Sequence, residues 1–245
     1  MDTGAERMIE IIMDEHGIFL GDSQVGKTTT AIYICQLQNA KGYTTVFVNS
    51  KDDKKLYTIN GLKQGGARYI DVSLEQFAYL LEQKVTDGII EIRPKLSEEN
   101  LIAQIEPYLK TLLNWKRRNP LHPVFCCVDE VHLYQSKMSL ISSLKNCVVM
   151  GKGLNLYMGL LSQRPTQIHN DLFTQTEYYF IQGLNSRDLK YLYENRYLAI
   201  PEGWILPLND PACTYPWKHN KHRLFFQQAK FDGLLEITPL NKPPF

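Results

Sequence analysis

The fold is decided by residues 17–28, which read Gly17-Ile-Phe-Leu-Gly-Asp-Ser-Gln-Val-Gly-Lys-Thr28. The apolar run at residues 18–20 predicts a buried strand. Residues 21–28 match the pattern G-x-x-x-x-G-K-S/T, a glycine-rich loop that holds phosphate groups. Apolar residues then follow at helical spacing and predict that the loop opens a helix: Ala31, Ile32, Ile34 and Leu37. A strand, this loop and a helix in that order distinguish a phosphate-binding loop from a chance match.

The loop contains the groups that a triphosphate requires. Backbone N–H groups from Ser23 onward can surround phosphate oxygens, and the helix N-terminus adds partial positive charge. We expect Lys27 to reach the β- and γ-phosphates and the Thr28 hydroxyl to bind Mg²⁺. The predicted nucleotide-binding residues are Gly21, Asp22, Ser23, Gln24, Val25, Gly26, Lys27, Thr28 and Thr29.

Length and composition limit the classes of protein to consider. The chain has 245 residues, of which 44% are apolar, so it can form one domain with extensions, or at most two, around a sizeable core. Its 27 basic and 26 acidic residues leave a net charge of +1, which excludes a globally basic nucleic-acid coat protein. The five cysteines lack metal-binding spacing and are expected to be buried thiols.

Hydropathy gives no indication of a membrane span. No apolar run reaches the roughly 18 residues that cross a bilayer. The N-terminus lacks the charged and then apolar layout of a signal peptide. We therefore expect a soluble, intracellular protein and not an integral membrane protein.

Strands and helices are predicted to alternate along the chain, which favours an α/β fold with a mainly parallel sheet between helices. Strands are expected at residues 7–13, 18–20, 43–48, 68–72, 89–92 (an edge strand), 124–128, 155–161, 177–182 and 223–231. Helices are expected at residues 26–40, 74–84 after the N-cap Ser73, from 97–99 to 116–120, 135–151, 167–172 and 185–198. Residues 51–66 are expected to form a short helix and a loop.

The composition changes beyond Ile200. Prolines become frequent, and two tryptophans occur among them: Pro201, Trp204, Pro207, Pro211, Pro216 and Trp217. We therefore expect residues 1–200 to form the core and residues 201–245 to form a small irregular or β extension that packs on it.

A second motif follows the apolar run at residues 124–128, which predicts a strand buried on both faces. Asp129 and Glu130 come directly after it, at the sheet edge where parallel α/β proteins bind ligands. Beside a phosphate loop, Asp129 would hold Mg²⁺ and Glu130 would act as general base on the attacking water. His132 is given no role, because such a residue is more often packed or solvated in a turn.

A third motif, Ser162-Gln163-Arg164-Pro165, follows the next predicted strand. If that strand lies between the loop strand and the Asp-Glu strand, its end faces the γ-phosphate. Gln163 could then hydrogen-bond the γ-phosphate or the attacking water and respond to the state of the nucleotide.

Together the three motifs resemble the FtsK–HerA superfamily of ATPases, and the Ser-Gln-Arg-Pro motif is their most specific part. The short chain is most similar to genome-packaging ATPases of membrane-containing double-stranded DNA viruses. The resemblance covers about residues 15–200. It implies a RecA-like core, ATP and Mg²⁺ as ligands, and a homohexameric ring that moves double-stranded DNA. It further implies location in the host cytoplasm or the virion, with a capsid or membrane-vertex component as possible partner.

The family also implies that a basic residue from a neighbouring subunit completes each ATP site. Members often have Gly-Arg before the last core strand, whereas this chain has Gly151-Lys152-Gly153. Lysine cannot make the planar two-point contact of arginine, so the identity of the residue stays open. The candidates are Lys152, Arg164, Arg187 and Arg196.

Two other functions share the same ATP site. The chain could belong to a pilus, secretion or phage-export machine and act on protein partners in place of DNA. A non-catalytic nucleotide-binding scaffold is disfavoured because Lys27 and Glu130 are both present.

Overall fold

The computed structural model describes residues 14–50, 67–95, 100–135, 140–218, 221, 223–228 and 234–237. The strand predicted at residues 7–13, the elements predicted at 51–66 and the helix start predicted at 97–99 lie outside these residues.

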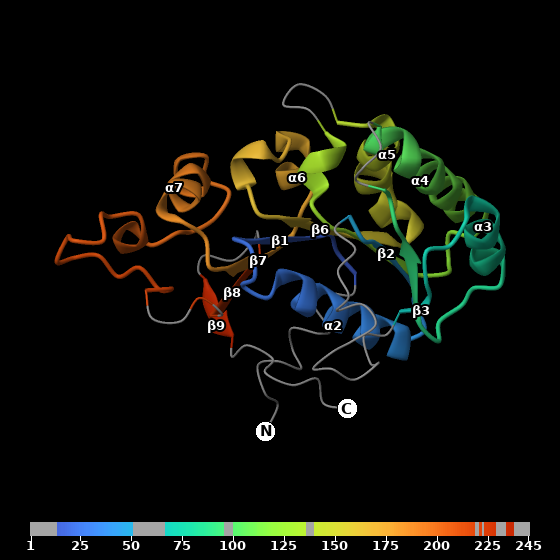
Figure 1. The fold of residues 1–245 in the computed structure, drawn as a ribbon, viewed down its shortest axis with the longest axis horizontal. Helices are drawn as coiled ribbons and strands as arrows, with labels where there is room; N and C mark the ends of the chain where they lie inside the picture. The colour runs from blue at the N-terminus through green and yellow to red at the C-terminus, as the bar shows by residue number, and fades with distance from the viewer. Residues whose placement is uncertain are drawn as a thin grey trace.

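Within the described residues, nine strands form one sheet in the order β3-β4-β2-β5-β6-β1-β7-β8-β9 (Figure 1). The strands are β1 (Gly17–Gly21), β2 (Thr44–Val48), β3 (Ala67–Tyr69), β4 (Ile89–Ile92), β5 (Val124–Val128), β6 (Leu156–Ser162), β7 (Tyr178–Gln182), β8 (Leu224–Gln228) and β9 (Leu235–Ile237). In this order, every pair of neighbouring strands from β3 through β7 is parallel. Strand β8 pairs antiparallel with β7, and β9 pairs antiparallel with β8. The predicted α/β class with a mainly parallel sheet is confirmed.

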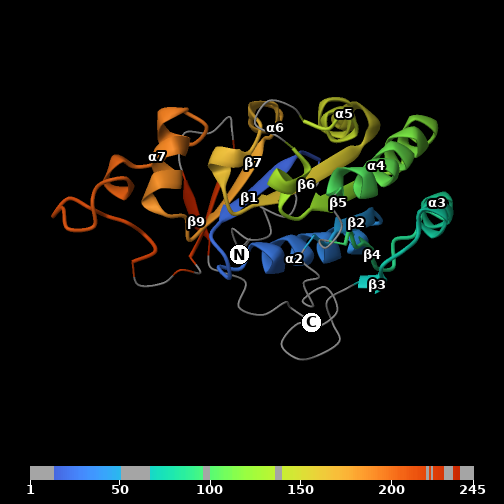
Figure 2. The same cartoon turned by 45° about the horizontal axis from the view of Figure 1, so that its top comes forward.

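Helices cover both faces of the sheet (Figure 2). One face carries α2 (Lys27–Ala40), and the other carries α4 (Leu101–Arg118), α5 (Ser142–Gly151), α6 (Asn170–Thr174) and α7 (Ser186–Glu194). Helix α3 (Leu74–Glu82) packs against α4. Short 3₁₀ helices occur at η2 (Val131–Tyr134), η3 (Lys152–Leu154), η4 (Pro165–Gln167) and η5 (Glu202–Trp204).

The two faces have separate hydrophobic cores because side chains alternate along each strand. In β1, Ile18 and Leu20 belong to the larger core under α4 and α5, whereas Phe19 belongs to the core under α2. All five residues of β1 are buried, as expected for a central strand covered on both faces.

Several predicted boundaries are wrong. The strand predicted as an edge strand, β4, lies between β3 and β2, and all of its residues are buried. The helix predicted from residue 135 begins as α5 at Ser142, after η2. The helix predicted at 167–172 is replaced by η4 and α6, because His169 between them has extended backbone angles. Helix α7 ends at Glu194 and not near residue 198, and β9 was not predicted.

The predicted N-cap of α3 is confirmed. Ser73 is the N-cap of α3 and forms a capping box with Gln76. Four cysteines are buried free thiols and Cys213 is half-buried. No helix of the described residues is long and apolar enough to cross a membrane.

The C-terminal region adds to the same sheet through β8. Trp204 and Trp217 pack edge-on against Phe225 of β8, with ring centroids 4.7 and 5.4 Å from it. The division of the chain at residue 200 stays a prediction.

Candidate nucleotide-binding site

The loop between β1 and α2 has the backbone that only glycine allows at its two fixed positions. Gly26 has a φ of 118°, in the left-handed region. A Cβ at Gly21 would lie 1.9 Å from the carbonyl oxygen of Gln182, so the loop and β7 could not approach as they do. Both glycines are therefore required by the shape of the loop.

Lys27 is folded into the loop that precedes it. Its side chain is buried, and Nζ donates hydrogen bonds to the carbonyl oxygens of Gly21 at 2.6 Å and Asp22 at 2.7 Å. The ammonium group therefore lies at the first residues of the loop, which is where a lysine of this motif meets the terminal phosphates.

Gln182, at the end of β7, contacts the loop and was not among the residues predicted from the sequence. Its side-chain amide nitrogen donates to the Val25 carbonyl at 3.4 Å, and its amide oxygen accepts from the Thr30 hydroxyl at 3.4 Å. The backbone N–H of Asp22 donates to the carbonyl of Gly183 at 3.2 Å. The end of β7 therefore supports the loop. In the sequence, the only indication that Gln182 lies near the loop is that it is the last residue of a predicted strand.

Asp129 and Glu130 lie at the end of β5, at the same edge of the sheet as the loop. Each is only 2% exposed. The backbone carbonyl of Asp129 accepts a hydrogen bond from the Ser50 hydroxyl, which anchors it to the residues that follow β2. Both carboxylates are thus held in a largely dry environment, where electrostatic interactions are stronger than in water.

The Glu130 carboxylate contacts two side chains. The Gln163 amide nitrogen donates to Oε1 at 2.6 Å, and His132 Nδ1 lies 3.2 Å from Oε2. Ser162 Oγ is 3.3 Å from the same His132 nitrogen. Gln163 therefore contacts the predicted base, and its predicted contact with the γ-phosphate or the attacking water stays a prediction.

His132 was missed because its role depends on the turn after β5. The 3₁₀ helix η2 starts directly after Glu130, and its first turn brings His132 beside the carboxylate. In the sequence, His132 is marked only by its position two residues after Glu130. A histidine so close to an acidic residue is too common to indicate a role.

The residues predicted to hold Mg²⁺ are oxygen ligands at this edge of the sheet. Thr28 is half-buried in the first turn of α2, and Asp129 directly follows β5. The described residues contain no group of three His, Cys, Asp or Glu side chains that could bind a metal alone. A hydroxyl and one carboxylate fit Mg²⁺, which usually takes few protein ligands and shares its coordination with phosphates and water.

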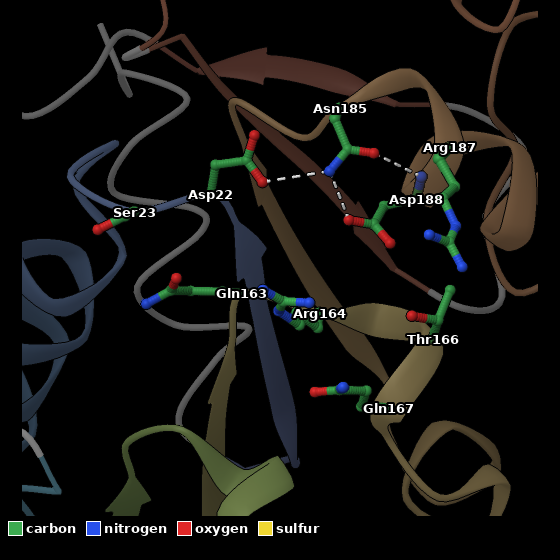
Figure 3. Close-up of a pocket in the computed structure, with 9 residues that line it drawn as sticks. All are labelled: Asp22, Ser23, Gln163, Arg164, Thr166, Gln167, Asn185, Arg187 and Asp188. Atoms are coloured by element: carbon green, nitrogen blue, oxygen red, sulfur yellow. Dashed lines mark hydrogen bonds between the residues drawn. The ribbon is translucent and has the colours of Figure 1, made fainter.

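A cavity of about 390 Å³ opens beside the first residues of the loop (Figure 3). We call it the loop cavity. It lies between the loop, the end of β6 and the start of α7, and its lining includes Asp22, Ser23, Gln163, Arg164, Asn185 and Arg187. Three segments that are distant in sequence therefore meet around one space.

Asn185 connects α7 to the loop. As the N-cap of α7, it accepts a hydrogen bond from the Asp188 backbone at 2.9 Å. Its amide nitrogen donates to the carboxylates of Asp188 at 2.7 Å and Asp22 at 3.4 Å. Burial raises the pKa of Asp188 and the charge of Asp22 adds to the rise, whereas the Asn185 hydrogen bond and the nearby arginines oppose it.

The structure separates the candidate basic residues. Lys152 pairs with Glu15, and its Nζ lies 3.4 Å from Glu177. These residues precede β6, β1 and β7, so they lie at the opposite edge of the sheet from the loop. Arg196 is exposed beyond the end of α7 and does not line the loop cavity, whereas Arg164 and Arg187 do.

No protein-family model and no curated protein matches the sequence. Solved structures do match. The genome packaging NTPase B204 from Sulfolobus turreted icosahedral virus 2, in complex with AMPPCP, has a TM-score of 0.65 at 10% identity, over 92% of this chain and 98% of that one. VirB4 of Thermoanaerobacter pseudethanolicus has a TM-score of 0.66 at 11% identity, over 93% of this chain and 90% of that one.

The cytoplasmic domain of the Thermomonospora curvata Type VII secretion ATPase EccC has a TM-score of 0.59 at 14% identity, over 93% of this chain and 25% of that one. These matches confirm, as a likeness of fold, the resemblance that the three motifs predict. The chain therefore has the α/β fold of these ATPases, with a mostly parallel sheet and antiparallel C-terminal strands.

Proposed function

We propose that the chain is a Mg²⁺-dependent ATPase. The observation that carries this proposal is the hydrogen bond between Gln163 and Glu130, because it joins the ends of β6 and β5. Since β6 lies between β5 and β1, the same edge also holds the phosphate loop. The three predicted motifs therefore converge on one site that has the parts for ATP hydrolysis.

Each residue has a distinct part in the proposed reaction. Lys27 and the backbone N–H groups of the loop bind the triphosphate. Glu130 accepts a proton from water as the water oxygen bonds to the γ-phosphorus and the bond to the β–γ bridging oxygen breaks, leaving ADP and phosphate. Thr28 and Asp129 would hold Mg²⁺, which neutralises phosphate charge when bound.

We further infer that hydrolysis drives movement of double-stranded DNA, most simply as a viral genome-packaging motor built as a homohexameric ring. The three motifs and the likeness to the packaging NTPase B204 support this choice. The net charge of +1 is compatible with it, because converging subunits need only a few Lys or Arg contacts each to hold one duplex.

A second candidate is an ATPase of a secretion machine that acts on protein partners. The match to EccC, described as a Type VII secretion ATPase, is the observation that favours it. The two candidates share the hydrolytic site and differ in what stimulates it.

The experiment measures ATP hydrolysis by the purified protein and by two variants. Lys27→Ala should abolish turnover, because it removes the cation that meets the terminal phosphates. Glu130→Gln should still bind ATP but hydrolyse it about 10²- to 10⁴-fold more slowly, because the amide cannot accept the proton. A Glu130→Gln protein with normal turnover would refute the assigned base.

The same assay with duplex DNA at low and high salt separates the two candidates. A DNA-moving ATPase should be stimulated by duplex, and the stimulation should weaken steeply as salt rises, because phosphate contacts release counterions. If a protein partner stimulates hydrolysis and duplex DNA does not at any salt concentration, the result would favour the secretion candidate instead.

A further inference from the structure

Lys27 shows which end of the loop receives the terminal phosphates. Its ammonium group lies against the carbonyl oxygens of Gly21 and Asp22. A lysine of this motif binds the β- and γ-phosphates. The γ-phosphate of a bound nucleotide would therefore lie beside Asp22 and Ser23, the residues at the start of the loop.

The loop cavity opens at this end. Asp22 and Ser23 form one part of its lining, and Gln163, which holds the base Glu130, forms another. The cavity is thus continuous with the place where the γ-phosphate and the attacking water would meet. At about 390 Å³ it has room for a phosphate group and for side chains that extend into it from the opposite wall.

Two arginines from different elements face this space (Figure 3). Arg164 lies two residues past the end of β6, and Arg187 lies in the first turn of α7. Among the described residues, neither guanidinium has a hydrogen-bond or ion-pair partner. Their charge is nevertheless felt inside the cavity, because both oppose the rise in the pKa of Asp188 that burial causes.

The other basic candidates do not face the cavity. Lys152 is occupied by two glutamates at the far edge of the sheet, and Arg196 points to solvent beyond α7. An arginine also suits the task better than a lysine, because its planar donors match two phosphate oxygens at once.

We propose that Arg164 and Arg187 bind the γ-phosphate of the nucleotide held by their own subunit, so that they act in cis and not on a neighbour's site. This inference rests on the proposed ATPase function. The two guanidiniums stabilise the negative charge on the γ-phosphoryl oxygens while the water oxygen bonds to phosphorus and the bridging bond breaks. Any basic residue donated by a neighbouring subunit would then be additional to this pair.

The first test compares ATP and ADP binding to Arg164→Ala, Arg187→Ala and the double variant, with Arg196→Ala as the matched control. Because ADP lacks the γ-phosphate, each single cavity variant should lose about 10- to 100-fold in affinity for ATP and bind ADP within about twofold of wild type. Arg196→Ala should bind both nucleotides as wild type does. Wild-type ATP affinity in the double variant would overturn the proposal.

The second test mixes subunits. Each cavity variant is combined with Glu130→Gln, which has both arginines but no base, and ATP hydrolysis is measured across mixing ratios. If the arginines act in cis, no subunit in the mixture has a complete site and activity stays at the sum of the separate variants. Recovery of activity on mixing would show that the arginines reach a neighbouring site and would overturn the proposal.

The outcomes separate this inference from the proposed function. A wild-type chain that binds neither ATP nor ADP, with Lys27→Ala indistinguishable from it, would refute the ATPase proposal itself. ATP binding that depends on Lys27 but not on the arginines would leave the ATPase standing and refute only their role in cis.

Discussion

Glu130 is held in an unfavourable backbone conformation by its surroundings. Its φ of 48° is in the left-handed region, which costs a residue with a side chain on the order of 1–3 kcal/mol. Such a conformation persists when neighbouring contacts determine it. Here Gln163 and His132 contact the two carboxylate oxygens, and the start of η2 at Val131 fixes the chain on the other side.

This arrangement predicts a positioning role for His132. His132→Ala should lower kcat about tenfold with KM nearly unchanged, because the carboxylate loses one of two contacts that orient it toward water, while phosphate binding is untouched. His132→Asn, which keeps a polar nitrogen near Glu130, should recover part of the rate. Equal losses for both variants, or a change confined to KM, would contradict the role.

His16 joins three elements at the opposite end of β1. Its Nε2 lies 2.8 Å from the Val148 carbonyl of α5, and the Met158 backbone N–H of β6 donates to Nδ1 at 2.9 Å. The second contact requires an unprotonated Nδ1, so the neutral ring is the form that fits. Burial lowers the pKa of His16 to about 4, and the Val148 hydrogen bond and Glu177 only partly oppose this.

This junction should make stability depend on pH. The unfolded chain takes up a proton on His16 near its ordinary pKa of 6.5, whereas the folded chain resists protonation down to about 4. Stability is therefore lost as pH falls from 6.5 to 4, by up to about 3 kcal/mol from this group. Urea unfolding at pH 7.5 and 4.5 should show a larger drop for wild type than for His16→Gln. Equal drops would contradict the assignment.

At the scale of the whole molecule, the sheet order determines the site. Strands β5, β6 and β1 are neighbours, so their carboxyl ends bring Glu130, Gln163 and the phosphate loop to one edge. The sheet continues past β1 through β7, whose last residue Gln182 supports the loop, to β8. The C-terminal region therefore covers the strand that carries this support.

Removal of residues 201–245 should consequently weaken nucleotide binding as well as stability. The truncation exposes the edge of β7 and removes the tryptophans that pack on β8, so we expect a lower melting temperature and weaker ATP binding. Truncation after Ile237 keeps both β8 and β9 and serves as the control. If a chain ending at residue 200 keeps the wild-type melting temperature and ATP affinity, the C-terminal region does not support the nucleotide site.

Prediction from the sequence succeeded where the signal is local. The strand, glycine-rich loop and helix at residues 17–40 depend on residue types at set spacing, and the N-cap Ser73 acts within one helical turn. Prediction failed where the position of an element depends on which elements pack beside it in the folded chain. The strand at residues 89–92 looked like an edge strand, because its apolar pattern does not show that β3 pairs on its outer side.

The sequence alone determined the α/β class and the strand, glycine-rich loop and helix at residues 17–40, and it singled out Asp129, Glu130 and Gln163 as candidates, because each depends on residue types at fixed spacing. Only the tertiary structure decided that Gln163 and His132 contact the Glu130 carboxylate, that Gln182 supports the loop and that Arg164 and Arg187 share one cavity. The physical reason is that these contacts join strand ends far apart along the chain. Their proximity follows from the order of strands in the sheet, which no local pattern specifies.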